Sequence, residues 1–299
     1  MNRLKYSLIA IFAFGSLAVF GQKSTGAAQF PELTPDVRGV GMGNSGVAAT
    51  ANAFSIYRNA AKSIFSTQKA EIGYSFTPWL RELSKGSNLH GVAGYWNLDE
   101  KQGITAGFRW FNHSETNIWD KEGNDAGTFT PKDWSVDVGY ARKLTDDLSV
   151  GATARFIRSD MSGLDKDVAN AVAFDLGLYY RRNFENWEQS QWAVGLQASN
   201  FGTKIDYGYG KYDQASKVAA GGMIDHVFTD KHRLQGTLDV ACQVLPNTNW
   251  GGSVGVEYTL LQIVAIRGGY HYGEQDNKLQ RYGTLGCGVG CHHIKADFA

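Results

Sequence analysis

Apolar and polar residues alternate one by one along most of this chain, and that period of two limits the folds the sequence can adopt. Successive side chains of a β-strand point to opposite faces, so strict alternation predicts strands with one apolar face. The clearest examples are residues 133–142, 170–181, 232–243 and 249–259. We predict an all-β fold with thirteen strands: 69–79, 88–97, 103–112, 133–142, 148–158, 170–181, 191–199, 215–227, 232–243, 249–259, 263–272, 281–290 and 292–298.

The lengths of the connections indicate what surrounds these strands. Alternation alone does not decide this, because soluble barrels and sandwiches alternate as well. Short links occupy residues 98–102, 143–147, 228–231 and 260–262. Longer polar connections occupy residues 80–87, 113–132, 159–169, 200–214 and 273–280, while 182–190 and 244–248 break the pattern. Outer-membrane barrels have short periplasmic turns and long external loops, so the pattern favours a transmembrane barrel.

Tryptophans collect at the ends of the predicted strands. The outer ends carry Trp79, Trp110, Trp134 and Trp250, and the inner ends carry Trp96 and Trp192. Tryptophan suits a boundary between water and lipid because one edge of the indole is polar and the rest is apolar. Trp119 and Trp187 lie in connections, and we do not expect them to join either ring.

The opposite face of the strands is too polar for a packed core. Its charged residues are Arg109, Asp137, Arg155, Asp175, Asp225, Asp239, Glu257 and Arg267. The interior of a barrel of this size is too wide for side chains alone to fill, so these residues are expected to face a wet or plugged lumen. The predicted register places Arg155 between Asp137 and Asp175, and Glu257 beside Arg267. Such pairs could line a path for a solute, but we favour a role in balancing charge and holding a plug.

The N-terminus has the pattern of a secretory signal peptide. Arg3 and Lys5 precede an apolar run from Tyr6 to Phe20, which is short for a spanning helix and ends near Gly21. We therefore predict export to the outer membrane of a Gram-negative bacterium. The predicted organisation is a signal peptide (1–21), an N-terminal segment in the lumen (22–66) and a transmembrane β-barrel (67–299).

Other classes of function find little support. The 29 basic and 29 acidic side chains balance, which leaves no basic footprint for nucleic acid. Cys287 and Cys291 lie four residues apart in a predicted strand, roughly 13 Å, which is too far for a disulfide. With His292 and His293 they could form a metal site, but small residues beside a turn are the simpler interpretation. The sequence shows no Ser/His/Asp arrangement, so we expect no enzymatic activity. We also expect no metal and no cofactor.

A run of small residues, Gly41–Thr50, precedes the first predicted strand. Small residues allow close backbone packing, so this run could tuck into the barrel as a plug. Together with Asp36–Gly43 and Asn59–Ala60–Ala61 it resembles the N-terminal hatch of the FadL-like superfamily of long-chain fatty acid transporters. That superfamily usually has Pro where Ala60 stands here. The resemblance implies that Gly41, Met42, Gly43 and Asn59 belong to a hatch inside the lumen.

Further segments are similar to the PorV family, which contributes the outer-membrane component of the type IX secretion system. They are Tyr74–Arg81, Gly94–Trp96, Arg109–Phe111, Asp137–Leu144 and Arg155–Asp160. The resemblance implies a fourteen-stranded FadL-like barrel that binds the C-terminal signal domain of secreted cargo at the cell surface. It also implies delivery of that cargo to an attachment complex with a sortase-like subunit, which fixes it to lipopolysaccharide. The family has been named as a lipopolysaccharide O-deacylase too, but no nucleophile–base arrangement supports that role here.

One departure from the family concerns the C-terminus. Family members continue through a last strand that ends in an aromatic residue, whereas this sequence stops at Ala299, within or just after the thirteenth predicted strand. Single-chain bacterial barrels have even strand counts. We therefore expect either a miscounted strand or a truncated sequence, and favour truncation.

Three functions remain open at this level. The first is the cargo-binding role, with contacts from the aromatic and apolar residues of the external loops: Trp79, Leu80, Trp119, Phe129, Phe201, Tyr207 and Tyr209. Ordinary loop packing is the alternative for each of these residues. The second is a FadL-like transporter of hydrophobic small molecules, with a kink at Gly221–Gly222 or Gly268–Gly269. The third is a structural barrel that acts within a partner complex, as in PorQ-like relatives.

Overall fold

The computed structural model of the chain describes residues 30–79, 86–119, 123–161, 168–187, 189–208, 210–273, 281–291 and 294–299. The predicted signal peptide, residues 1–21, lies outside the described residues, as do His292 and His293. Within the described part, no helix has the length and apolar character needed to span a membrane.

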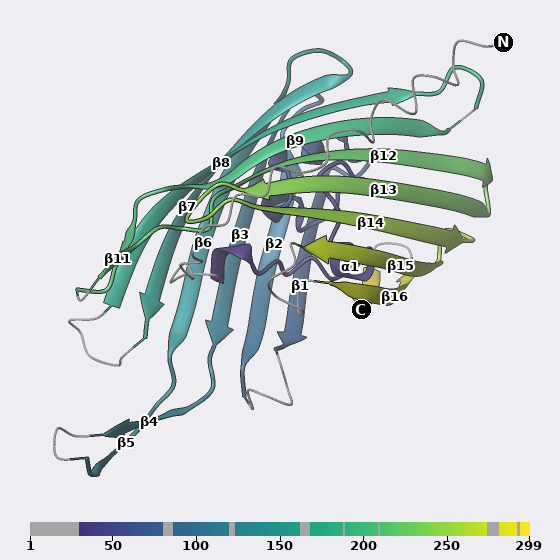
Figure 1. Cartoon of the computed structure of the whole chain (residues 1–299). Helices are drawn as coiled ribbons and strands as arrows, with labels where there is room; N and C mark the ends of the chain where they lie inside the picture. Colours follow the sequence, from purple (N-terminus) through teal and green to yellow (C-terminus); the bar gives the residue numbers. More distant parts are fainter. Residues whose placement is uncertain are drawn as a thin grey trace.

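A single curved antiparallel sheet of thirteen strands dominates the fold (Figure 1). Its order is β1-β2-β3-β6-β7-β8-β9-β12-β13-β14-β15-β16-β17, so each strand pairs with the next strand of the same sheet, and β1 and β17 stand at opposite ends. The bounds are β1 Ala70–Pro78, β2 Asn88–Asn97, β3 Gln102–Asn112, β6 Lys132–Lys143, β7 Leu148–Asp160, β8 Val168–Asn183, β9 Gln191–Gly202, β12 Lys217–Thr229, β13 His232–Gln243, β14 Asn249–Leu260, β15 Val264–Gly273, β16 Tyr282–Cys291 and β17 Ile294–Phe298.

These are the thirteen predicted strands, with ends that differ by at most three residues. The prediction missed two short hairpins within external loops. One pairs β4 (Thr116–Trp119) with β5 (Asp125–Phe129), and the other pairs β10 (Ile205–Asp206) with β11 (Lys211–Tyr212). In Figure 1 the β4–β5 hairpin extends well beyond the edge of the large sheet.

The two faces of the sheet differ as the alternation predicts. On β8 the side chain of Leu176 is 64% exposed, whereas its neighbour Asp175 is 5% exposed. The same contrast separates Val138 from Asp137 and Leu238 from Asp239. The convex face is therefore a continuous apolar surface, and the charged residues point to the concave side. Soluble proteins do not leave an apolar surface of this extent uncovered, whereas a lipid bilayer covers it.

The N-terminal segment occupies the concave side of the sheet and is called the hatch below, described from Phe30 to Ser66 (Figure 1). Its short helices are η1 (Phe30–Glu32), α1 (Val37–Gly41), η2 (Ser55–Tyr57) and η3 (Ala60–Phe65). Helix α1 packs against β15, β16 and β17, while η3 packs against β6, β7 and β8. The hatch thus bridges distant strands of the sheet and fills the space between them.

Candidate functional site

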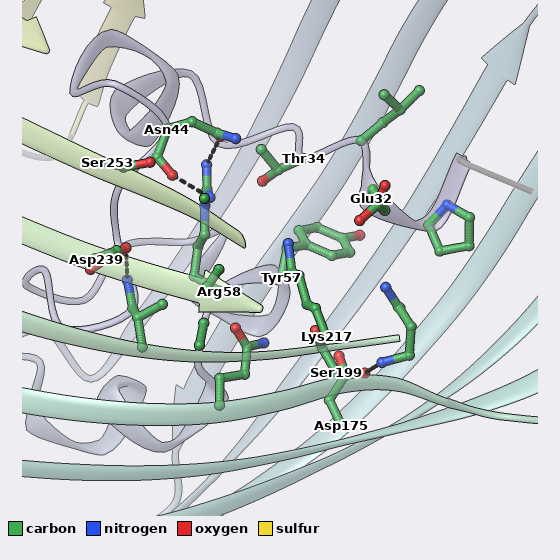
Figure 2. Close-up of a pocket in the computed structure, with 18 of the residues that line it drawn as sticks. Glu32, Thr34, Asn44, Tyr57, Arg58, Asp175, Ser199, Lys217, Asp239 and Ser253 are labelled. Carbon is green, nitrogen blue, oxygen red and sulfur yellow. Dashed lines mark hydrogen bonds between the residues drawn. The ribbon is translucent and has the colours of Figure 1, made fainter. Parts of the chain in front are cut away.

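A polar cavity of about 80 Å³ lies between the hatch and the wall of the barrel (Figure 2). Tyr57 and Arg58 of the hatch line one side of it. The wall contributes charged and polar side chains from β8, β9, β12, β13 and β14, namely Asp175, Ser199, Lys217, Asp239 and Ser253. Such a lining favours water over an apolar solute, and the volume suffices for a few water molecules.

Several buried polar atoms around this cavity have no hydrogen-bond partner among the described residues. They are the Tyr57 hydroxyl, Arg58 Nε, Arg109 Nη2, Ser199 Oγ and Asp239 Oδ1. A buried polar atom without a partner costs about 1–3 kcal/mol. Water in the cavity would offset that cost, so we infer that the interior is polar and hydrated rather than apolar.

A buried ion cluster closes one side of the cavity. Arg155 on β7 donates to Asp137 on β6, and its Nη2 lies 2.9 Å from Asp175 Oδ2 on β8. Asp175 also accepts a 2.7 Å hydrogen bond from the backbone N–H of Asn200. Arg109 on β3 extends the cluster, with Nη2 at 3.6 Å from Asp137. The structure thus brings together the Asp137, Arg155 and Asp175 side chains that the sequence placed on adjacent strands.

Arg109 also joins the cluster to the hatch. Its Nη1 donates to the backbone carbonyls of Pro31 and Leu33, at 3.0 and 3.1 Å. Its guanidinium lies 4.5 Å from the centre of the Tyr57 ring and 5.2 Å from that of Phe30. Cation–π contacts of this kind strengthen when water is excluded. The buried arginine therefore holds both the wall and the hatch in place.

A second ion cluster anchors α1 to the other side of the barrel. Arg38 of the hatch binds Glu257 on β14 through two hydrogen bonds, Nε to Oε2 at 2.9 Å and Nη2 to Oε1 at 2.7 Å. Glu257 also pairs with Arg267 on β15, at 2.5 Å, and Arg267 pairs with Asp297 on β17 at 2.6 Å. Burial alone would lower the pKa of the Arg38 guanidinium, but the Glu257 carboxylate and its hydrogen bonds raise that pKa above its ordinary value. The Glu257–Arg267 pair thus contacts the hatch through Arg38.

The predicted hatch residues make close backbone contacts with the wall. Thr284 Oγ1 of β16 donates to Gly41 O at 3.1 Å and accepts from the backbone N–H of Gly43 at 2.8 Å. Met42 lies against Gly255 and Gly269, at both of which a Cβ atom would overlap the hatch backbone. Asn59 donates from Nδ2 to Leu178 O of β8 at 2.9 Å and caps η3 by accepting from Ala61 N.

Sequence reasoning placed Asp239 on the lumen face but missed the charged residues of the hatch itself. Asp239 on β13 accepts hydrogen bonds from the backbone N–H groups of Gly46 and Val47, at 2.6 and 3.0 Å. Lys62 is buried and donates to Gly46 O at 2.7 Å, and burial lowers the pKa of its ammonium to about 8. One signal was available: Arg38, Arg58 and Lys62 are charged residues within a run of small ones.

Gly43 offers a direct test of how tightly the hatch fits. Its φ is +69°, and a Cβ atom there would lie 2.6 Å from both Tyr270 N and Val254 O. We expect Gly43→Ala to lower the free energy of unfolding by about 1–3 kcal/mol, because strain and overlap add. Urea titration of the folded barrel in detergent measures this. Gly222→Ala is the matched control, since a Cβ atom at Gly222 meets nothing within 4 Å; equal stability of the two variants would contradict a tightly seated hatch.

An apolar cluster, called the mouth cluster below, covers the outer end of the lumen. It is formed by Phe30, Leu89, Phe111, Ile157, Ala169, Ala171, Ala173, Ile205 and Tyr207, with Leu33, Trp79 and Tyr212 packed against it. These residues come from the hatch, from the outer ends of β2, β3, β7 and β8, and from the β10–β11 hairpin. The hairpin therefore folds inward over the mouth instead of extending into solvent.

The residues predicted as external contacts divide into two groups. Trp119 on the β4–β5 hairpin is 61% exposed, Phe129 on the same hairpin is partly exposed, and Phe201 on β9 is 37% exposed. Tyr207 is 3% exposed and its hydroxyl lies 2.9 Å from Ser159 Oγ, while Trp79 packs edge-on to Phe111. Tyr207 and Trp79 thus hold the mouth cluster together and present little surface to a partner. Leu80 and Tyr209 lie outside the described residues.

One prediction about the aromatic rings is wrong. Trp187 lies in the link between β8 and β9, but its ring packs 4.6 Å from that of His226 on the outward face of β12. It also lines a cleft together with Trp192. The link folds back onto the wall, so Trp187 joins the aromatic residues at the inner strand ends.

Comparison with known proteins agrees with this geometry. The chain is similar in fold to the TodX deltaS2S3 mutant monoaromatic hydrocarbon channel, with a TM-score of 0.58 and 11% identity over 85% of this chain and 89% of that one. It is also similar to the Pseudomonas putida toluene transporter TodX, with a TM-score of 0.52 and 11% identity over 92% and 91%. For the Ralstonia pickettii toluene transporter TbuX the TM-score is 0.51, with 12% identity over 85% and 89%.

These likenesses, at such low identity, establish the fold alone, and they confirm the predicted FadL-like fold class. Among the described strands β1 and β17 do not pair, so the sheet is not closed into a complete barrel. No curated protein matches the sequence. Residues 21–249, well over half of the chain, match the family described as "Type IX secretion system protein PorV". The match confirms the predicted family: the chain belongs to the PorV family of type IX secretion system proteins.

Proposed function

We propose that this chain binds the C-terminal signal domain of secreted proteins at the cell surface and passes them to the attachment complex. Membership of the PorV family implies an outer-membrane component of type IX secretion. The finer role requires an external surface that a folded domain can reach. The observation that supports it is the β4–β5 hairpin, which extends beyond the sheet at the end of the long loops (Figure 1).

The hairpin has the chemistry of a binding surface for a β-sandwich domain. Trp119 and Ile118 are both exposed, and an exposed tryptophan that becomes buried on binding is a common source of interface energy. β4 and β5 pair only with each other among the described strands, so their outer edges are free to accept a strand from a partner. Cargo signal domains, translocon subunits and the sortase-like attachment subunit are the partners that we propose, in a setting of outer-membrane lipid and lipopolysaccharide.

The interior supports a role in binding over one in the transport of hydrophobic molecules. A transporter of hydrophobic small molecules needs an apolar pocket, whereas the lumen cavity described above is lined by charged side chains and bounded by the hatch. We propose a binding component that is not a catalyst. The lipid-facing apolar wall and the hatch then serve to hold the external loops in position.

We expect Trp119→Ala to weaken cargo binding by tenfold or more, because removal of a central interface tryptophan costs about 2 kcal/mol or more. Affinity purification of the tagged full chain from its host, followed by mass spectrometry, measures recovery of signal-domain cargo and of attachment subunits. Trp250→Ala, on the lipid-facing outer end of β14, is the control for loss of one exposed tryptophan. Unchanged recovery with Trp119→Ala would exclude the hairpin as the contact.

Deletion of the gene tests the role as a whole. We expect proteins that carry the signal domain to accumulate in the periplasm, since their receiver at the surface is missing. Fractionation and immunoblotting of one such protein measures this. Normal secretion in the deletion strain would overturn the proposed function.

A further inference from the structure

The link between β8 and β9 is the longest of the described inner links, and it folds against the outside of the barrel. It runs from residue 184 to 190, whereas the other inner links span two to four residues. The rings of Phe184 and Trp187 lie 5.0 Å apart, and Trp187 packs against His226 on the outward face of β12. The link thus builds a wall of a cleft on the lipid-facing side of the barrel.

The cleft has a volume of about 480 Å³, and we call it the inner cleft. That volume falls within the range of about 300–1,000 Å³ that is usual for ligand sites. Trp192 on β9 lines it and packs at a tilt against Tyr180 of β8, with ring centres 5.4 Å apart. Arg182 lines it too, directly opposite Trp192 in the pairing of β8 with β9.

Arg182 is an unusual residue for this place. The preceding residue, Arg181, points into the lumen, where it donates to Phe65 O at 3.1 Å. Arg182 points the other way, towards lipid, and among the described residues it makes no hydrogen bond or ion pair. Tryptophan and arginine at the end of a membrane strand lie at the depth of the lipid head groups, where a guanidinium meets phosphate. An arginine binds a phosphate with two parallel hydrogen bonds.

The inner cleft also carries the opposite charge. Glu185 lies in the link, three residues from Arg182, and lines the same cleft. A carboxylate repels an anionic head group, but it attracts an ammonium group. The exposed ring of Trp187 offers a second contact for a cation through its π face.

We propose that the inner cleft binds the head group of a zwitterionic phospholipid of the inner leaflet, with phosphate on Arg182 and ammonium between Glu185 and Trp187. The acyl chains run along the apolar outward face of β9 and β12, over residues such as Val194 and Ile224, which are both exposed. The two opposite charges in one cleft distinguish this lipid from an anionic one. The site is independent of cargo binding, which the external end of the barrel performs.

Native mass spectrometry of the delipidated full-length protein in detergent tests the site. We expect one phosphatidylethanolamine to be retained at low lipid excess, in preference to phosphatidylglycerol. Arg182→Gln is expected to weaken retention about tenfold, since a charge-assisted hydrogen-bonded pair is lost. Glu185→Gln is expected to abolish the preference between the two lipids.

Arg158→Gln is the matched control. Arg158 is an outward, exposed arginine at the outer end of β7, opposite Trp134 in the pairing with β6. Equal retention by the Arg158→Gln and Arg182→Gln variants would show only general lipid contact and would overturn the proposal. Equal binding of both lipids by the unmodified protein would overturn the assignment of a zwitterion.

A photo-crosslinking amino acid at Asn186, which lines the cleft, identifies the occupant in cells. An adduct with the mass of a phospholipid supports the proposal, whereas an adduct with a periplasmic protein overturns it. The faster migration of unheated folded barrel on a denaturing gel shows that each variant is folded before it is compared.

Discussion

Arg155→Met is expected to lower the free energy of unfolding by about 3–5 kcal/mol, the usual cost of removing one partner from a buried ion pair. Arg155 lies between Asp137 and Asp175, and all three side chains are buried. Methionine has a similar length and no charge, so the change leaves the buried Asp175 carboxylate without the guanidinium that it pairs with. Urea titration of the refolded barrel in detergent, followed by tryptophan fluorescence, measures the loss.

Two further variants separate the ion pair from mere loss of a long side chain. In Arg155→Met with Asp175→Asn, the cluster is neutral again and Asp137 retains Arg109, so at least half of the loss should be recovered. Arg158→Met removes an arginine three residues later on the same strand, from the outward face, and should change stability by no more than about 0.5 kcal/mol. If Arg155→Met were as stable as Arg158→Met, the cluster would not hold the wall.

The strands of the large sheet could be predicted because lipid on one side and a polar lumen on the other impose a period of two on each. The β4–β5 hairpin could not be predicted in this way. All four residues of β4, from Thr116 to Trp119, are exposed, so apolar and polar residues do not alternate along it. The alternation also indicated the register of neighbouring strands. For that reason the sequence alone placed Arg155 beside Asp137 and Asp175.

Contacts of the hatch could not be predicted in the same way. Arg38 and Glu257 are 219 residues apart, and nothing local in either segment specifies the other. The small residues around Gly43 indicated a plug, but not the strands that it meets. Trp187 and Tyr207 were misplaced for a related reason: each lies in a connection that folds back onto the barrel, and a residue pattern within a loop does not reveal the direction of the fold.

Leu176→Arg tests the assignment on which the whole structure depends, namely that the apolar face of the sheet meets lipid. Leu176 is 64% exposed and lies near the middle of β8. Near the midplane of a bilayer an arginine on the lipid face costs about 2–4 kcal/mol. We therefore expect a loss of that size in the stability of the barrel refolded into lipid vesicles, and a lower amount of protein in the outer membrane.

Leu144→Arg is the matched control, because Leu144 is 57% exposed but lies in the inner link between β6 and β7. At the boundary of the membrane the same substitution costs only about 0–1 kcal/mol. The two leucines have nearly the same exposure, so an aqueous environment would tolerate both arginines equally. A difference of about 2 kcal/mol or more between the variants therefore reports the depth of each residue in lipid, whereas equal stability would mean that the apolar face does not lie in a membrane.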